Sequence, residues 1–291
     1  MPHPNLTNNK AIAMLKAAEA GGYGVPGVVS YNLETITAVI RAAEAKRSPV
    51  QILLFPWAQT YAPNNLLIQL AASACQDAKV PVALHLDHAQ SPEAIRAAAD
   101  IPNAFDSIMV DMSHHEKDEN LALTKELTAY CHERGIATEA EPGRMNGGED
   151  GVADTGDLEG VLTTPEEAMR FVETGIDILA PAFGNVHGNY GGVENMKLQF
   201  NRLESIRAAT SGRVTLVLHG TNGFPDSLMQ SCVKGGMTRC NVNELVLSKY
   251  SAYVAENTGK VPLTVLMEEG AKLIQELVER QMDVVGSTGR A

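Results

Sequence analysis

The chain has 291 residues, a formal net charge of −12 at pH 7 and 44% hydrophobic residues. This length suits one α/β barrel, which commonly takes about 250 residues, and the apolar content is enough for a large core. Such a negative charge repels phosphodiester backbones, so nucleic acid is not an expected partner, although backbone N–H groups can still hold a small phosphate. No uninterrupted apolar run of about 18 residues predicts a membrane span, and the polar start of the chain lacks a signal-peptide pattern. The four cysteines show no C-x-x-C spacing, which favours reduced, buried thiols in a cytoplasmic protein.

Short apolar runs alternate with longer amphipathic stretches along the chain. The apolar runs predict eight strands, at Gly27–Tyr31, Val50–Phe55, Val82–Asp87, Ser107–Asp111, Ala137–Glu141, Ile178–Pro181, Thr215–His219 and Arg239–Val242. The stretches between them predict helices, at Thr35–Lys46, Leu66–Asp77, Pro92–Ala99, Asn120–Arg134, Pro165–Thr174, Arg202–Thr210 and Asp226–Lys234. This regular alternation predicts a parallel sheet that closes into a (β/α)8 TIM barrel.

We expect one domain over residues 1–291, with the barrel at about 17–256 and a helical extension at 257–291. Within the extension, Leu263–Val278 predicts a C-terminal helix additional to the barrel, which could cover the barrel or pair two subunits. The final residues, Ser287–Ala291, read as frayed. The longest connection, Pro142–Leu162, is rich in glycine and follows a strand that ends in carboxylates, so it predicts a lid over a site.

Polar residues end most of the predicted strands, and in such barrels catalysis takes place at the C-terminal strand ends. Six of the eight strands end in, or run into, a potential ligand, an acid–base group or a pair of amides: Asp87 and His88, Asp111, Glu139 and Glu141, His187, His219, and Asn241 and Asn243. The three imidazoles that follow separate strands suit a catalytic zinc with an open coordination position. The carboxylates could orient those histidines or hold a second cation. Each residue alone is a weak signal, but together they indicate a metal centre.

Several motifs, in order along the chain, resemble the signature of the class II fructose-bisphosphate and tagatose-bisphosphate aldolases. The motifs are Pro81–Ala89 (PVALHLDHA), Asp111–His115 (DMSHH), Glu139–Gly143 (EAEPG), Gly147–Gly151 (GGEDG), Thr164–Ala168 (TPEEA), Gly184–Gly188 (GNVHG) and Leu218–Pro225 (LHGTNGFP). The similarity runs from about Ala17 to Leu245. It implies a metal-dependent aldolase that reversibly cleaves a ketose or related ketol between C3 and C4.

The resemblance also implies a metal set. His88, His187 and His219 would bind one catalytic Zn²⁺ ion per chain, which would polarise the ketone of the donor and stabilise its enediolate. Glu141 and Asp111 match residues that support a second or alternative metal position. A second divalent or a monovalent cation is left open.

The same resemblance assigns roles toward the substrate. Asp87 would be the acid–base group for the C4 hydroxyl proton, and Glu149, on the glycine-rich loop, the base for the donor's C3 proton. Gly188 and Gly220 would present backbone N–H groups to the donor. A homodimer or higher homo-oligomer is implied as well.

The region expected to hold the donor's phosphate departs from the family. Asn222 stands where a phosphate-binding serine is expected, and Gly191 replaces a lysine. After strand eight, Asn241 is followed by Asn243 and Glu244, and the usual threonine is missing. Because each lost charge-assisted hydrogen bond is worth roughly 1.5–3 kcal/mol, phosphate binding should weaken. The three asparagines remain candidates for substrate binding, and we expect a donor other than dihydroxyacetone phosphate.

Three other functions compete with this prediction. An ordinary fructose-1,6- or tagatose-1,6-bisphosphate aldolase would need substitute phosphate contacts. A metal-dependent barrel hydrolase is disfavoured because no His-x-His pair ends strand one. A non-catalytic sugar-binding homologue is disfavoured because Asp87 and the candidate zinc histidines are all present.

Overall fold

The computed structural model describes residues 3–145 and 161–291, and its strands form a closed parallel barrel in the order β1 to β8. The strands are β1 (Val25–Val29), β2 (Val50–Leu54), β3 (Val82–Ala89), β4 (Ser107–Val110), β5 (Ala137–Ala140), β6 (Ile178–Leu179), β7 (Thr215–Leu218) and β8 (Met237–Val242). Pairing of β1 with β8 closes the barrel. The predicted fold class is therefore confirmed, with each strand end within two residues of its predicted place.

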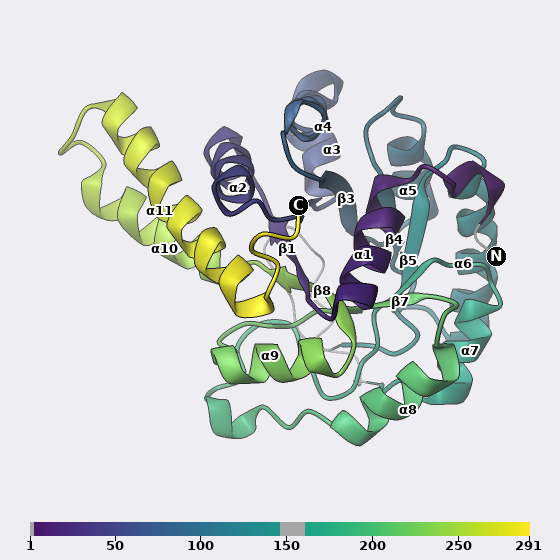
Figure 1. The fold of residues 1–291 in the computed structure, drawn as a ribbon. Coiled ribbons are helices and arrows are strands. Elements are labelled where there is room, and N and C mark those ends of the chain that lie inside the picture. The colour runs from purple at the N-terminus through teal and green to yellow at the C-terminus, as the bar shows by residue number, and fades with distance from the viewer. Residues whose placement is uncertain (1–2, 146–160) are drawn as a thin grey trace.

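A ring of helices surrounds the strands (Figure 1). It consists of α2 (Leu33–Lys46), α4 (Leu66–Asp77), α5 (Pro92–Ala99), α6 (Lys117–His132), α7 (Pro165–Val172), α8 (Phe200–Thr210), α9 (Asp226–Lys234) and α11 (Leu263–Val285). Polar caps define several starts: Asn32 and Thr35 form a capping box at α2, Ser91 caps α5, and Thr164 caps α7. Asn32, which follows β1, thus caps a helix.

Short elements add to this ring, and the sequence patterns did not predict them. At the N-terminus, η1 (Pro4–Leu6) leads into α1 (Lys10–Gly21), and α3 (Trp57–Tyr61) and η2 (Pro63–Asn65) precede α4. A further turn, η3 (Val193–Asn195), lies before α8. Apolar residues of α1 share a buried cluster with barrel residues such as Val25, Ala83 and Ala137. Because these residues occupy the beginnings of β1, β3 and β5, α1 packs against the N-terminal end of the barrel.

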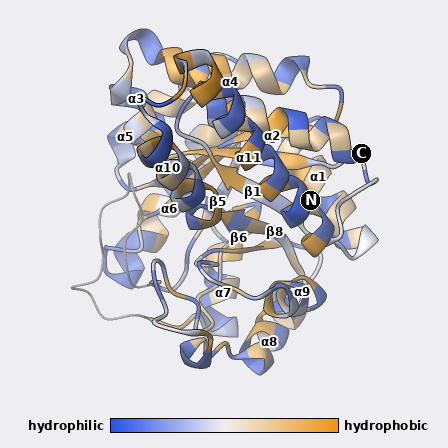
Figure 2. Cartoon of the chain, turned by 90° about the vertical axis from the view of Figure 1, so that its left-hand side faces the viewer, coloured by the Kyte–Doolittle hydropathy of each residue, from blue (hydrophilic) through white to orange (hydrophobic). Residues whose placement is uncertain are grey.

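The main core lies between the strands and the helix ring. The strands are buried along their whole described length, and Figure 2 shows hydrophobic colouring concentrated on the barrel, with hydrophilic patches on the helices around it. This pattern is typical of an α/β barrel, whose parallel sheet is covered on both faces. No helix of the described residues is long and apolar enough to cross a membrane.

The C-terminal helix α11 packs against α2, with further contacts to α9 and β1 (Figure 1). Of the two roles left open for it, the structure shows the covering one. Its first residues, including Leu263, Val265 and Met267, stay exposed where α11 and its neighbour α10 (Glu244–Asn257) project from the ring.

The expectation that the chain frays after α11 is wrong. Ser287 is fully buried, and its hydroxyl pairs with that of Ser48 at 2.7 Å. The N–H of Gly289 donates to the carbonyl of Lys46, and that of Ala291 donates to the carbonyl of Arg47, both at 2.9 Å. Short-range polarity suggested fraying, but these long-range hydrogen bonds order the segment against the end of α2.

Candidate active site

The end of β3 carries two functional candidates side by side in sequence. Neighbouring strand residues ordinarily point to opposite faces, yet Asp87 and His88 line the same cavity. His88 has a φ of +49°, in the left-handed region, and the β3–β4 pairing shifts register between Leu86 and Ala89. A non-glycine residue rarely adopts this conformation, and such strain is concentrated at functional sites. The irregularity delivers both side chains to one place.

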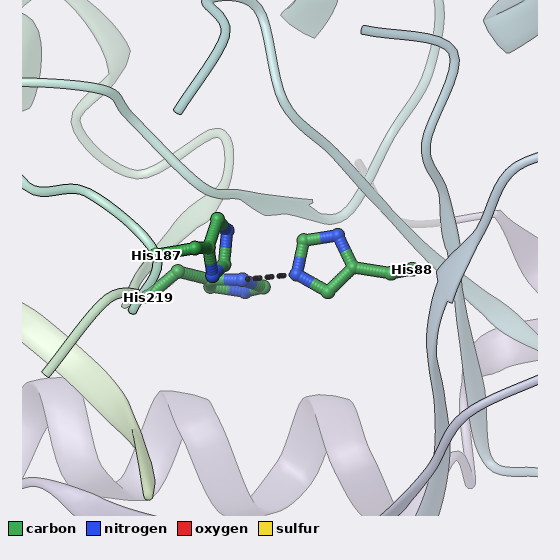
Figure 3. Close-up of side chains that lie close together, drawn as sticks. All are labelled: His88, His187 and His219. Carbon is green, nitrogen blue, oxygen red and sulfur yellow. Dashed lines mark hydrogen bonds between the residues drawn. The ribbon is translucent and has the colours of Figure 1, made fainter. Parts of the chain in front are cut away.

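Three histidines from different parts of the chain converge at the C-terminal end of the barrel (Figure 3). His88 is the penultimate residue of β3, His187 lies in the loop after β6, and His219 follows β7. The ring of His88 is centred 4.8 Å from that of His187 and 4.9 Å from that of His219. One nitrogen from each ring falls within 4.8 Å of the others, which is compatible with three ligands of one metal ion.

Buried carboxylates form hydrogen bonds with one ring nitrogen of His88 and one of His219. Nδ1 of His88 donates to Oδ2 of Asp111, and Nε2 of His219 donates to Oε1 of Glu139, both at 2.8 Å. When both rings are neutral, as metal binding requires, these nitrogens carry the protons, and Nε2 of His88 and Nδ1 of His219 offer their lone pairs to an ion. Those two atoms face each other at 3.0 Å. Carboxylates that fix the tautomer of ligating histidines are typical of zinc sites, so the donor set fits zinc.

Glu141 lies beside this group and is almost fully buried. Its Oε1 accepts a hydrogen bond from the backbone N–H of Met145 at 2.7 Å, while its Oε2 has no hydrogen-bond partner among the described residues. Burial and the nearby Asp111 raise the pKa of Glu141 well above its usual value. A buried carboxylate oxygen without a partner is costly, and a cation would remove that cost. Asp111 differs, because its Oδ1 is already held by the hydroxyl of Ser113 at 2.7 Å.

Asp87 is 2% exposed and accepts a hydrogen bond from Nδ2 of Asn241 at 3.1 Å. Burial raises the pKa of Asp87, but the adjacent His88 and His219 outweigh it and hold the pKa below its usual range. The group is therefore ionised, and a carboxylate can accept a proton.

The cavity beside these residues has a volume of about 120 Å³. The candidates Gly188 and Gly220 line it, with positive φ values of 80° and 66°, and a Cβ on Gly220 would lie 2.3 Å from the carbonyl oxygen of Val186. The hydroxyl of Tyr190 donates to the carbonyl of Gly220 at 2.7 Å and accepts from the N–H of Val186 at 2.9 Å. It thereby fastens the loop after β6 to the loop after β7.

The same cavity carries residues that depart from the family pattern. Asn222, Asn243 and Glu244 line it, together with Asn241, which holds Asp87. None of the described residues that line this cavity is a lysine or an arginine. Gly191 does not line it. Glu149 and its loop lie outside the described residues.

A larger cavity, of about 310 Å³, lies at the opposite end of the barrel, lined by residues that include Lys16, Asp177 and Arg213. It contains none of the candidate catalytic or metal-binding residues. Because chemistry in this fold resides at the C-terminal strand ends, we assign the smaller cavity as the candidate active site.

Sequence reasoning missed a polar layer inside the barrel. His85 is fully buried, with Nε2 3.5 Å from carboxylate oxygens of Asp87 and Glu139. Arg239 is also fully buried and forms an ion pair with Glu139 at 2.8 Å. The available signal was a charged residue within a strand, two positions before Asn241 and therefore on the same face.

Comparisons with known proteins agree with this geometry. Residues 9–290 match the family model for fructose-bisphosphate aldolase class-II. A putative fructose-bisphosphate aldolase of Coccidioides immitis is 54% identical over 100% of this chain and 98% of its own length. A fructose-bisphosphate aldolase of Streptococcus pneumoniae is 37% identical over 95% of this chain and 97% of its own.

Solved structures show the same relationship. The crystal structure of a putative fructose-1,6-bisphosphate aldolase from Coccidioides immitis has a TM-score of 0.96 and 55% identity, covering 98% of this chain and 99% of that one. The YdjI aldolase from Escherichia coli K12 has a TM-score of 0.83 and 30% identity, covering 97% and 98%. The chain belongs to the class II fructose-bisphosphate aldolase family. It is thus an enzyme of the carbon–carbon lyase class, and the hydrolase and non-catalytic alternatives are set aside.

Proposed function

We propose that this enzyme is a metal-dependent aldolase whose carbonyl donor is not dihydroxyacetone phosphate but a ketol without a phosphate dianion. The observation that carries the proposal is the composition of the donor wall, which is the part of the cavity lined by Thr221, Asn222, Asn243 and Glu244. Two amides, a hydroxyl and a carboxylate line it, and no cationic side chain of the described residues does.

The described side chains support zinc as the cofactor. His88, His187 and His219 would hold one ion, and Glu141, with its partnerless oxygen, would serve a second or alternative cation position. A bound divalent ion would polarise the donor carbonyl and act as the electron sink of the aldol step. Asp111 would act chiefly by orienting His88.

Asp87 would perform the proton transfer of cleavage. Its carboxylate would accept the proton of the C4 hydroxyl while the C3–C4 bond breaks and its electron pair moves toward the donor carbonyl. The aldehyde product then leaves, and a second acid, for which we propose Glu149, would return a proton to C3. The N–H groups of Gly188 and Gly220 would fix the donor, since both line the cavity. In the condensation direction each step reverses.

The donor terminus would meet Asn222, Asn243 and Glu244. The carboxylate of Glu244 accepts from the hydroxyl of Ser248 at 2.6 Å and would repel a nearby dianion. Amides and a carboxylate are instead suited to hydrogen-bonding neutral hydroxyls. Oδ1 of Asn243 already accepts from the hydroxyl of Tyr31 at 2.9 Å, which orients this amide. This wall therefore favours a hydroxylated, uncharged donor end.

The alternative is an ordinary fructose- or tagatose-bisphosphate aldolase, and the printed names of the relatives favour it. Calorimetric titration of the zinc-loaded protein with dihydroxyacetone phosphate and with dihydroxyacetone separates the two proposals. Saturable binding of the phosphate at micromolar levels would establish the alternative. Preference for the neutral donor, abolished by a chelator, would support our proposal.

We also propose that the chain forms a single-domain cytoplasmic homodimer. The exposed Leu263, Val265 and Met267 on the projecting part of α11 provide an apolar surface for a second copy. Light scattering of Leu263→Glu, compared with the unchanged protein, tests this. A mass of one chain in both samples would refute the dimer.

A further inference from the structure

We propose that Arg239 is a positioning residue for the aldol step: it holds the side-chain amide of Asn241 so that its NH₂ group faces Asp87. The inference rests on the proposed function for the catalytic role of Asp87. Arg239 itself does not line the cavity. It lies one layer deeper in the barrel and acts through its neighbour.

The guanidinium of Arg239 is fixed by acceptors on different strands. Its Nε donates to Oδ1 of Asn241 at 2.7 Å, and its Nη1 donates to Oε1 of Gln51 at 3.1 Å. Its Nη2 lies 3.0 Å from Oε1 and 2.8 Å from Oε2 of Glu139. A planar guanidinium with partners on β2, β5 and β8 has little freedom to turn, so each partner is oriented in return.

The orientation of the Asn241 amide follows from these contacts. Its Oδ1 accepts from Arg239, so its Nδ2 is left to donate to Oδ2 of Asp87 at 3.1 Å. A flipped amide would set NH₂ against the Nε–H of Arg239 and a carbonyl oxygen against the carboxylate of Asp87. Both contacts would be repulsive, because arginine offers only donors and an ionised carboxylate only acceptors. Arg239 thus excludes the flipped state.

A glycine on the neighbouring strand leaves space for Arg239 and Asn241. Gly27 of β1 pairs in register with Asn241, and a Cβ at Gly27 would lie 2.8 Å from Oδ1 of Asn241 and 3.0 Å from Cδ of Arg239. Any larger residue there would push both side chains. The missing side chain on β1 therefore makes room for the long arginine and for the amide it orients.

Stability alone does not account for the ion pair. Arg239 and Glu139 are both fully buried, and well-packed apolar residues of similar volume are often as stable as a buried ion pair. What the pair adds is direction: Glu139 holds Nε2 of His219, and Asn241 holds Asp87. Glu139 thereby helps to fix the guanidinium, and the guanidinium directs the Asn241 amide toward the proposed base.

The test compares Arg239→Lys, which keeps a buried cationic donor, with Arg239→Met, which has similar length and no donor. We expect Arg239→Met to bind zinc at the stoichiometry of the unchanged protein but to lose about 100-fold in kcat for cleavage, with little change in KM, because a misplaced base affects the chemical step. Arg239→Lys should recover most of the loss. If Arg239→Met fails to fold, the double variant Arg239→Met/Glu139→Gln removes the unpaired carboxylate, and Glu139→Gln is its control.

Two further readouts separate positioning from general damage. Exchange of the carbon-bound protons of dihydroxyacetone with D₂O, followed by NMR, requires the metal and the second acid–base group but not Asp87. It should stay within about threefold of the unchanged protein in Arg239→Met. A crystal structure of that variant, or of the double variant, should show Nδ2 of Asn241 turned away from Asp87 while the three histidines stay in place.

Arg239→Met with cleavage within about threefold of the unchanged protein would overturn the proposal. So would a crystal structure in which Asn241 keeps its contact with Asp87. If the wild-type protein neither cleaves ketols nor exchanges donor protons, the proposed function is wrong. The crystallographic comparison would still decide whether Arg239 orients Asn241.

Discussion

Removal of the carboxylate behind His88 should weaken zinc binding without unfolding the barrel. In Asp111→Ala, Nδ1 of His88 loses an acceptor at 2.8 Å in a site where the histidine is 5% exposed, so water replaces it poorly. A hydrogen bond to a charged group contributes about 1.5–3 kcal/mol, which corresponds to roughly 10- to 150-fold in the dissociation constant. Loss of a partner that orients a metal-ligating histidine typically costs a similar 10- to 100-fold. Asp111→Asn keeps an acceptor but not its charge, so its zinc dissociation constant should lie between those of the wild-type protein and Asp111→Ala.

The assay is competition for zinc against a chromophoric chelator, with Asp177→Asn as a matched control. Asp177 also holds a histidine, His132, at 2.8 Å and in a buried setting, but at the N-terminal end of the barrel. The control should lower the free energy of unfolding and leave the zinc dissociation constant unchanged. Zinc affinity of Asp111→Ala within about threefold of the unchanged protein, or an equal loss in the control, would refute this reasoning.

Four further predictions follow from burial and hydrogen bonding. Burial lowers the pKa of His88, but the neighbouring Asp87 and Asp111 have the larger effect and raise it to about 10. Zinc binding near neutral pH should therefore release about one proton, which calorimetry in two buffers of different ionisation enthalpy would measure. Binding without proton release would contradict this. The raised pKa also means that the contribution of His88 to the stability of the metal-free protein is full below about pH 6.5 and is lost as the pH rises through about 10. All four cysteines are buried, and burial raises the pKa of each thiol. A thiol reagent should therefore label them only after the protein unfolds. Rapid labelling of the native protein would refute this prediction. Deletion of Ser287–Ala291 removes the hydrogen bond to Ser48 and two backbone hydrogen bonds to the end of α2. Urea denaturation should then show a free energy of unfolding lower by about 2–4 kcal/mol. An unchanged denaturation midpoint would show that the segment does not stabilise the fold.

Local sequence patterns were sufficient to predict the barrel and the polar residues at its C-terminal end. Buried parallel strands are short apolar runs, and the polar residues that interrupt them at their ends mark the C-terminal rim. His88, His219 and Asn241 were predicted in this way, and they meet in one cavity. Three helices, among them α4 and α5, have the predicted bounds, because Ser91 and Pro92, for example, define the start of α5 locally.

What the patterns missed depends on distant partners. Helix α1 has weak amphipathicity of its own and is held by the inner residues of strands that follow it, such as Val25. The left-handed backbone of His88 was not foreseen, because histidine carries no local preference strong enough to predict it. The contacts of Arg239 involve Gln51 and Glu139, which come from two other strands, and no spacing along one strand predicts them.

The measurement that tests the central claim most directly is cleavage and synthesis by the purified, zinc-loaded enzyme. Fructose 1,6-bisphosphate cleavage is compared with condensation of dihydroxyacetone onto glyceraldehyde, with a chelated sample and Asp87→Ala as controls. We predict chelator-sensitive condensation of the neutral donor, lost in Asp87→Ala, and little cleavage of the bisphosphate. Robust bisphosphate cleavage that disappears in both controls, with no use of the neutral donor, would contradict our account of the donor wall.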